Sequence, residues 1–354
     1  MTTAWCAFVV KKDGEKLRQW LIINSLLNQD AKIQSEDTWL IFPLMRELTE
    51  EEKIDLGKII EFFRFKERKI EFKQKQKPVD LYSALQNDIP KSLGDLIPKS
   101  FDIIGDLAIL EIPNELETYE NLIGKTILNL HPSINSVFKK LEPIQGDFRL
   151  RNLKLIEGIN NTITTHKENK CKYELDIREV YFSPRLSTEH ARVCSCVKNN
   201  EIILDMFAGI GPFSILIAKQ KQAQVFAVDL NPAAIYYLKK NIVLNKVENF
   251  VIPLEGDVRE LFKNNYSQKF DRLIMNLPSK SSEFLDIASL ILRNEGVIHY
   301  YQFVQESDYP TNFIKEIKVK FQQEGREILD ILQIRKVRPY APHIWQVVVD
   351  LLVK

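Results

Sequence analysis

The last half of the chain alternates regularly between two hydrophobic patterns. Short apolar runs such as EIILD (201–205), VFAVD (225–229) and RLIMN (272–276) are typical of buried strands. Longer apolar segments, PFSILIAKQ and PAAIYYLKKN, follow the first two runs and are typical of helices. This alternation predicts a doubly wound α/β fold with a mostly parallel sheet. The last two apolar runs, within EILDILQIRKVRPYAPHIWQVVVDLLVK, have only a turn between them, which predicts an antiparallel pair at the sheet edge.

The first 180 residues contain two smaller groups of strand and helix patterns. WCAFVV, GEKLRQWLIINSLL and TWLIFPL predict a strand, a helix and a second strand, so we expect a small α+β domain at residues 1–78. Three prolines between residues 76 and 100 predict a linker with short helical turns at residues 79–99. In FDIIGDLAILEIP, Gly105 and Asp106 separate two strand-like runs and predict a hairpin. We therefore expect an α+β middle domain at residues 100–179, followed by the alternating fold at residues 180–354.

Charge is balanced over the whole chain but not along it. The net charge is only +1, so a nucleic-acid partner has to be held by local basic patches. The strongest patch runs from Arg64 to Lys77, where seven Lys or Arg stand against two Glu, with Phe65 and Phe72 interleaved. This run predicts a nucleic-acid contact; the ordinary alternative is a solvated edge strand guarded by lysine.

Cysteine usage and hydropathy exclude several classes of protein. The four cysteines have no metal-ligand spacing and no nearby histidine cluster, so we expect reduced thiols and no metal site. No apolar run approaches the length of a membrane span, and the N-terminus has no signal-peptide pattern. These features predict a cytoplasmic protein with no membrane contact.

The stretch EIILDMFAGIGPFS (201–214) predicts a ligand site. An apolar strand ends in Asp205, and Gly209 and Gly211 form the loop that leads to Pro212 at the start of a helix. Glycines allow positive φ angles and a close approach of the backbone to a ligand, and proline suits the first position of a helix. α/β proteins use this layout to bind nucleotide-like ligands.

Three later strand ends identify the ligand. Asp229 ends the second strand, where an acid accepts hydrogen bonds from ribose hydroxyls. Asp257 follows the third strand and is placed to reach an adenine amino group, and Asn276-Leu277-Pro278 follows the fourth. Each aspartate alone could be a helix N-cap. In this order, however, the four signals predict an S-adenosylmethionine site.

Several motifs together carry a resemblance to a known family. They are GDFRLR (146–151), ITTHKEN (163–169), YFSPRLSTEHAR (181–192), DMFAGIGPFS, DLNP, GDVRE, IMNLP, GVIHYY and RPYAP. With them the chain closely resembles the archaeal and eukaryotic tRNA (guanine-37-N1) methyltransferases. The resemblance implies a Rossmann-like class I methyltransferase domain with a seven-stranded sheet and two small α+β domains before it. It also implies methyl transfer to N1 of the guanosine 3′ of the anticodon, with the base flipped out of the loop.

The resemblance also implies roles for individual residues. Glu189 falls at the proposed general base, Arg149 at the group that stabilises guanine O6, and Asn276 with Pro278 at the contact to the base. Guanine N1 carries a proton, and its removal places negative charge on O6, so a carboxylate and an arginine suit the reaction. The implied cofactor-binding residues are Tyr181, Arg185, His190, Asp205, Phe207, Gly209, Gly211, Asp229, Leu230, Asp257, Val258 and Asn276.

Two departures and two rival functions qualify this interpretation. His190 stands where the family has arginine next to the glutamate, which predicts a weaker or pH-dependent contact near the cofactor. Ser279 removes the aromatic residue that amino-group methyltransferases stack on a flipped base, which disfavours an exocyclic amine as target. The rivals are a wyosine-pathway enzyme, which methylates a tricyclic guanine or transfers aminocarboxypropyl, and a non-catalytic tRNA-binding protein. The resemblance implies that tRNA is bound at its anticodon arm and, through the N-terminal domain, at its outer corner. We expect a monomer.

Overall fold

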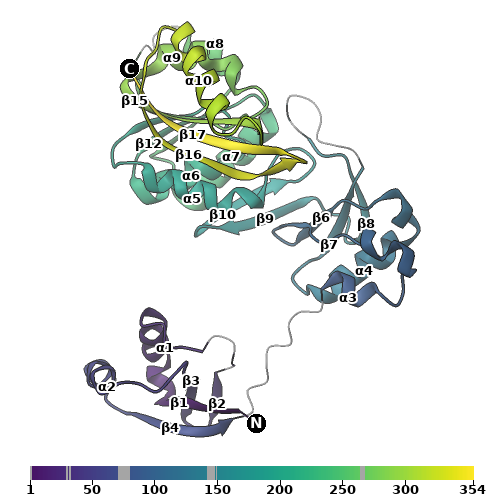
Figure 1. The fold of residues 1–354 in the computed structure, drawn as a ribbon, viewed down its shortest axis with the longest axis vertical. Coiled ribbons are helices and arrows are strands. Elements are labelled where there is room, and N and C mark those ends of the chain that lie inside the picture. Colours follow the sequence, from purple (N-terminus) through teal and green to yellow (C-terminus); the bar gives the residue numbers. More distant parts are fainter. Residues whose placement is uncertain are drawn as a thin grey trace. The chain divides into compact units, whose positions relative to one another are not determined.

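The computed structural model describes residues 2–28, 31, 33–70, 80–141, 148, 150–263 and 268–354. The chain forms two compact units, Met1–Asp80 and Leu81–Lys354, which are described separately (Figure 1). Among the described residues, no helix is both long and apolar enough to cross a membrane.

The first unit is a four-stranded antiparallel sheet with two helices. The strand order is β2-β3-β1-β4. Leu17, Trp20 and Leu21 recur at helical spacing and pack with Phe42 in the core of this unit. A capping box formed by Thr49 and Glu52 begins the second helix. The elements are β1 (Thr2–Val10), η1 (Lys11–Asp13), α1 (Gly14–Ile23), β2 (Gln34–Glu36), β3 (Trp39–Pro43), α2 (Glu50–Gly57) and β4 (Phe63–Ile70).

The basic run begins in an edge strand. β4 carries the first part of this run. In the described part of the chain β4 pairs with β1 alone, so it forms one edge of the sheet. Arg64 lies over the ring of Trp39 at 5.3 Å from its centroid. Lys73, Lys75 and Lys77 lie outside the described residues. A basic edge fits both the solvated-strand interpretation and a nucleic-acid contact, so the contact stays a prediction.

The predicted linker at residues 79–99 differs from the structure. Short helical turns do form there, as α3 (Leu81–Leu85) and η2 (Lys91–Leu96). However, Leu81, Leu85, Ile89 and Ile97 are buried with the side chains of the following sheet and helix, so this segment belongs to the core of the second unit. Pro90 is the N-cap of η2 and Pro98 follows its C-cap, so both prolines flank this helical turn and do not prevent the packing. The remaining domain boundaries stay predictions.

The second unit begins with a four-stranded sheet of order β5-β6-β7-β8. The predicted hairpin is confirmed, since β5 and β6 pair antiparallel around Gly105, whose φ is +58°. The elements are β5 (Asp102–Ile104), β6 (Leu107–Leu110), η3 (Asn114–Tyr119), α4 (Glu120–Leu130), β7 (Ser136–Lys140) and β8 (Leu153–Gly158). A separate antiparallel hairpin follows, formed by β9 (Ile163–Glu168) and β10 (Cys171–Asp176).

A seven-stranded sheet of order β13-β12-β11-β14-β15-β17-β16 completes the second unit. All neighbours from β13 to β15 pair parallel, and β17 runs antiparallel to both β15 and β16. This confirms the predicted Rossmann-like sheet with its antiparallel last strand. The strands are β11 (Ile202–Asp205), β12 (Gln224–Asp229), β13 (Val251–Glu255), β14 (Phe270–Met275), β15 (Leu292–Gln305), β16 (Ile328–Ala341) and β17 (Ile344–Val353).

Helices cover both faces of this sheet because successive strand residues point to opposite sides. Ile203 of β11 packs with α5, α6 and α7, whereas its neighbour Leu204 packs with α8, α9 and α10. Figure 1 shows the two sets of helices on either side of β15–β17. The helices are η4 (Pro184–Leu186), α5 (Ser187–Cys196), α6 (Pro212–Lys221), α7 (Pro232–Asn245), α8 (Val258–Phe262), η5 (Ser281–Phe284), α9 (Leu285–Ile291) and α10 (Thr311–Gln323).

Candidate active site

The glycine loop joins the carboxyl end of β11 to α6. Gly209 and Gly211 have φ angles of +55° and +91°, a region that favours glycine. A Cβ on Gly211 would lie 2.5 Å from Cδ1 of Leu238, so the loop packs too closely against α7 for a side chain there. Pro212 is the first residue of α6. The loop therefore has the backbone geometry that its sequence predicted.

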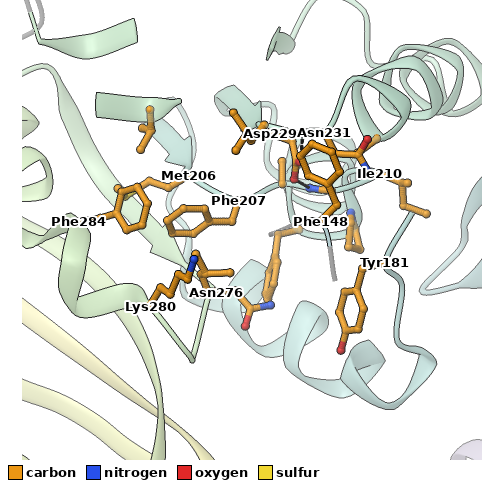
Figure 2. A pocket seen from close by; sticks show the side chains of 18 of the residues that line it. Phe148, Tyr181, Met206, Phe207, Ile210, Asp229, Asn231, Asn276, Lys280 and Phe284 are labelled. Carbon is orange, nitrogen blue, oxygen red and sulfur yellow. Dashed lines mark hydrogen bonds between the residues drawn. The ribbon is translucent and has the colours of Figure 1, made fainter. Parts of the chain in front are cut away.

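A cavity of about 560 Å³ opens at the carboxyl ends of the parallel strands, beside this loop. Figure 2 shows Met206, Phe207 and Phe284 together in one part of the pocket, and Asp229 beside Asn231 in another. The rings of Phe207 and Phe284 meet edge to face with centroids 4.9 Å apart. The predicted residues that line this cavity are Tyr181, His190, Phe207, Gly209, Asp229, Leu230, Asp257, Val258 and Asn276.

Asp229 is fixed by backbone donors on both sides. Its Oδ2 accepts a hydrogen bond from Gly209 N at 2.7 Å, and its Oδ1 accepts one from Asn231 N at 2.9 Å. Burial raises the pKa of Asp229, against the effect of these hydrogen bonds. Asp257 caps α8 and pairs with Arg259, whose hydrogen bond lowers the pKa of that carboxyl. The cavity thus contains two aspartates in different electrostatic surroundings.

Asp205 lies below the cavity and does not line it. Its side chain is fully buried, and its Oδ2 accepts a hydrogen bond from Ser214 Oγ at 2.7 Å. Its Oδ1 is buried without a partner among the described residues. Burial raises the pKa of Asp205 to about 7, and the charge of Asp229 adds to the effect of burial. Asp205, at the end of β11, therefore holds the first turn of α6 in place through Ser214.

His190 reaches the cavity wall and is paired behind it. Its Nδ1 lies 2.6 Å from Oε1 of Glu168, on β9, and its ring meets Phe213 edge to face. Burial acts to raise the pKa of Glu168, but the hydrogen bonds of His166 and His190 prevail and lower it to about 2. His190 is therefore held by a buried carboxylate.

Glu189 is buried but does not line the cavity. It is 2% exposed, and its carboxylate accepts hydrogen bonds from Arg192 Nη2 at 2.8 Å and from the Tyr301 hydroxyl at 2.6 Å. Arg192 also pairs with Asp350, and Arg335 Nη1 lies 3.6 Å from Oε2 of Glu189. The pairing with Arg192, which is the ordinary role of such a glutamate, is therefore present in this conformation.

Asn276 follows β14 and lines the cavity. Its Oδ1 accepts a hydrogen bond from Gln346 Nε2 at 3.1 Å. Pro278 is buried beside it, and its carbonyl accepts a hydrogen bond from Phe303 N at 3.2 Å. Pro278 does not line the cavity, although its neighbours Leu277 and Ser279 do. Asn276 is thus held in the wall of the cavity with its oxygen already bonded.

Three other predicted site residues are not among those that line the cavity. Arg185 pairs with Asp102 at 2.6 Å, and neither it nor Gly211 lines the cavity. Arg149 lies outside the described residues, although Phe148 lines the cavity.

Several residues of the cavity wall were not predicted from the sequence. Met206, Lys280 and Phe284 line the cavity, and Gln346 reaches it through Asn276. Met206 belongs to the glycine-loop stretch, although no role was predicted for it there. No motif marks Lys280, Phe284 and Gln346, which lie after β14 or on the C-terminal hairpin. The sequence did predict this hairpin, from two apolar runs with only a turn between them, but it did not indicate that Gln346 would reach the cavity.

Comparisons with known proteins agree over almost the whole chain. Residues 164–329 match the TRM5/TYW2 methyltransferase domain, residues 81–162 the TYW2 N-terminal domain, and residues 6–52 the tRNA methyltransferase 5 N-terminal domain. The tRNA (guanine(37)-N(1))-methyltransferase Trm5b of Pyrococcus abyssi is 40% identical, with 96% of each chain covered. The tRNA(Phe) (4-demethylwyosine(37)-C(7)) aminocarboxypropyltransferase of Pyrococcus horikoshii is 33% identical, with 76% of this chain and 94% of the relative covered.

A solved structure extends the agreement to three dimensions. The complex of aTrm5 and tRNALeu matches with a TM-score of 0.68 and 37% identity, and the match covers 98% of this chain and 99% of the other. With sequence, fold and glycine loop in accord, the chain belongs to the TRM5/TYW2 methyltransferase family, as its motifs predicted.

Proposed function

We propose that the chain transfers the methyl group of S-adenosylmethionine to N1 of guanosine 37, 3′ of the anticodon of tRNA. The observation that carries the proposal is the cavity that brings Asp229, Asp257 and Asn276 together at the strand ends. The full-length similarity to a tRNA (guanine(37)-N(1))-methyltransferase supports the choice of substrate.

The described residues fit the cofactor. Asp229 and Asp257 offer carboxylate oxygens of the kind that bind ribose hydroxyls and an adenine amino group. Phe207 and Phe284 give an apolar wall suited to a purine ring. When bound, S-adenosylmethionine supplies an electrophilic methyl group.

The residues of the chain must then remove the N1 proton of guanine and stabilise the negative charge that develops on O6. We assign the N1 proton of guanine to Glu189, whose carboxylate must turn from Arg192 and Tyr301 toward the cavity when the base enters. Loss of that proton leaves a lone pair on N1 and negative charge on O6. Asn276 holds the base, and Arg149, outside the described residues, stabilises O6. A placed base typically contributes ~10²–10⁴-fold to the rate of such a step.

The tRNA contacts and the solution state are also proposals. We infer that the second unit grips the anticodon arm and that the N-terminal unit, with its basic edge strand β4, docks on the outer corner of the tRNA. The match of residues 6–52 to the tRNA methyltransferase 5 N-terminal domain supports this role. We expect the enzyme to act as a cytoplasmic monomer.

One rival function has a specific observation in its favour. Residues 81–162 match the TYW2 N-terminal domain, and a relative that transfers aminocarboxypropyl is 33% identical. Mass mapping of unmodified tRNA after incubation with the enzyme and S-adenosylmethionine separates the functions. We expect one methyl group on guanosine 37. Absence of that methyl group would contradict the proposal. So would transfer of an aminocarboxypropyl group in a parallel reaction with tRNA that carries a wyosine precursor.

A further inference from the structure

A chain of hydrogen bonds from the C-terminal hairpin ends on Asn276. Arg338, on β16, donates from Nε to Oε1 of Gln346, on β17, at 2.8 Å. Gln346 in turn donates from Nε2 to Oδ1 of Asn276 at 3.1 Å. Arg338 and Gln346 are paired in the register of the two strands, and Gln346 is only 1% exposed. Two residues of one hairpin therefore orient the amide of Asn276, which follows β14.

The chemistry of arginine determines which group donates and which accepts in this series of hydrogen bonds. A guanidinium has five N–H donors and no acceptor, so Arg338 can bond only the oxygen of the Gln346 amide. The amide nitrogen of Gln346 must then face Asn276 and can bond only its oxygen. The nitrogen of Asn276 is left on the other side, and within the described part of the chain no acceptor bonds it. Asn276 is thus presented to the cavity as a hydrogen-bond donor.

Arg338 is itself held in place. Its Nη1 donates to Ser183 Oγ at 3.1 Å, and its Nη2 donates to the Tyr181 hydroxyl at 3.0 Å. Tyr181 and Ser183 both line the cavity. The arginine therefore joins the segment before α5 to the C-terminal hairpin, and it cannot rotate away from Gln346 without breaking three hydrogen bonds.

We propose that Arg338 and Gln346 are positioning residues that orient Asn276 to donate a hydrogen bond to O6 of a 6-oxopurine. This inference rests on the proposed function and deepens it, since it adds Asn276 to Arg149 as a donor to the 6-oxo group. A donor at this place stabilises the charge that O6 gains when N1 loses its proton. Adenine presents an amino group at the same position, so donor would face donor and adenosine would be rejected.

The substitution Gln346→Glu tests this orientation. One oxygen of the new carboxylate keeps Arg338, and the other accepts from Asn276, which must then turn its nitrogen away from the cavity. Loss of one donor to a developing oxyanion costs roughly 10²–10³-fold in rate in comparable sites, so we expect single-turnover methyl transfer to fall roughly 100-fold. Calorimetry should find S-adenosylmethionine affinity within a few-fold of wild type. Gln305→Glu, at an exposed position of β15, is the matched control and should keep the wild-type rate.

A double-mutant cycle separates positioning from general damage to the fold. If Gln346 acts only through Asn276, then Gln346→Glu has no further effect on the rate once Asn276→Ala is present. A purely structural role would slow the double variant by the same factor as the single one. Thermal unfolding of each variant with cofactor bound shows whether the fold is intact.

Two substrates identify the atom that Asn276 contacts. Inosine 37 keeps O6 and lacks only the 2-amino group, so we expect Gln346→Glu to slow transfer to inosine and guanosine equally. A wild-type rate for Gln346→Glu, additive effects in the cycle, or a penalty with guanosine alone would each overturn the inference. The proposed function fails separately, if wild-type enzyme makes no N1-methylguanosine at position 37.

Discussion

Tyr301 and Glu189 come from β15 and α5 and meet in the interior, where the tyrosine hydroxyl lies 2.6 Å from the carboxylate. Both side chains are buried, at 0% and 2% exposed. Burial raises the pKa of Tyr301 well above its usual range, and the nearby charge of Glu189 adds to this effect, so the hydroxyl stays protonated and acts as donor. The pair therefore fixes the carboxylate that we propose as the base.

Removing this donor should destabilise the folded state. In Tyr301→Phe, the buried carboxylate loses a hydrogen bond of the charged type, so we expect the free energy of unfolding to fall by about 1.5–3 kcal/mol. Denaturant unfolding measures the loss. Tyr300→Phe is the matched control, because its hydroxyl donates to the neutral Gln302. We expect a loss of only about 0.5–1.5 kcal/mol there, and equal losses in both variants would contradict this account.

Glu189→Gln should separate catalysis from cofactor binding. The amide cannot accept the N1 proton, so we expect methyl transfer to slow by ~10²–10⁴-fold in single-turnover assays. Glu189 does not line the cavity, so S-adenosylmethionine affinity should stay within a few-fold of wild type. Glu174→Gln, which changes a half-buried carboxylate paired with Lys240, is the control and should keep the wild-type rate. Collapse of cofactor binding with little change in the transfer step would refute the assignment.

Asp229→Asn should weaken the binding of S-adenosylmethionine. Both oxygens of Asp229 accept backbone hydrogen bonds, from Gly209 and Asn231. An amide has one oxygen, so one of these N–H groups would face an NH₂ group. We expect S-adenosylmethionine affinity to fall roughly 10- to 100-fold, as loss of one charge-assisted bond predicts. Calorimetric titration measures this, with the exposed Asp286→Asn as control; unchanged affinity in Asp229→Asn would remove the residue from the cofactor site.

Hydrophobic periodicity and motif spacing predicted those features of the structure that depend on a single short segment of the sequence. The parallel sheet followed from apolar runs with acids at their ends, and the positive φ angles of Gly209 and Gly211 followed from the loop. The prediction of a linker at residues 79–99 was wrong. Prolines indicate turns, but they do not indicate whether the apolar side chains between them are buried in a core, as they are here.

Pairings between distant segments could not be predicted in the same way. Glu168 and His190 are 22 positions apart in the sequence. Arg338 and Asn276 are joined by hydrogen bonds through Gln346, which no motif marks. Such contacts depend on strand order and on how one element crosses another. The pairing of Glu189 with Arg192, three residues further along α5, is local and was open to prediction from the sequence. The family resemblance named Glu189 but did not predict its hydrogen bond with Tyr301, which comes from the distant strand β15.

The stability of the protein should carry a pH dependence from Asp205. Burial raises the pKa of Asp205 to about 7, whereas an aspartate in the unfolded chain titrates near ~3.9. Between these values the folded state binds the proton more tightly, so the contribution of this group to the free energy of unfolding falls as pH rises from about 4 to about 7. Above pH 7 both states are ionised, and the contribution is constant.

Asp205→Asn removes this titration and keeps an oxygen that can accept from Ser214. Other groups also titrate, so the useful quantity is the difference in unfolding free energy between the variant and wild type. This difference should move in favour of Asp205→Asn between pH 5 and pH 8, because only wild type has to bury a carboxylate that ionises over that range. Urea unfolding at the two pH values measures it, and Asp286→Asn should show a constant difference. If the Asp205→Asn difference is also constant, the carboxyl ionises as freely in the folded state as in the unfolded one, and its burial beneath the glycine loop does not set its charge.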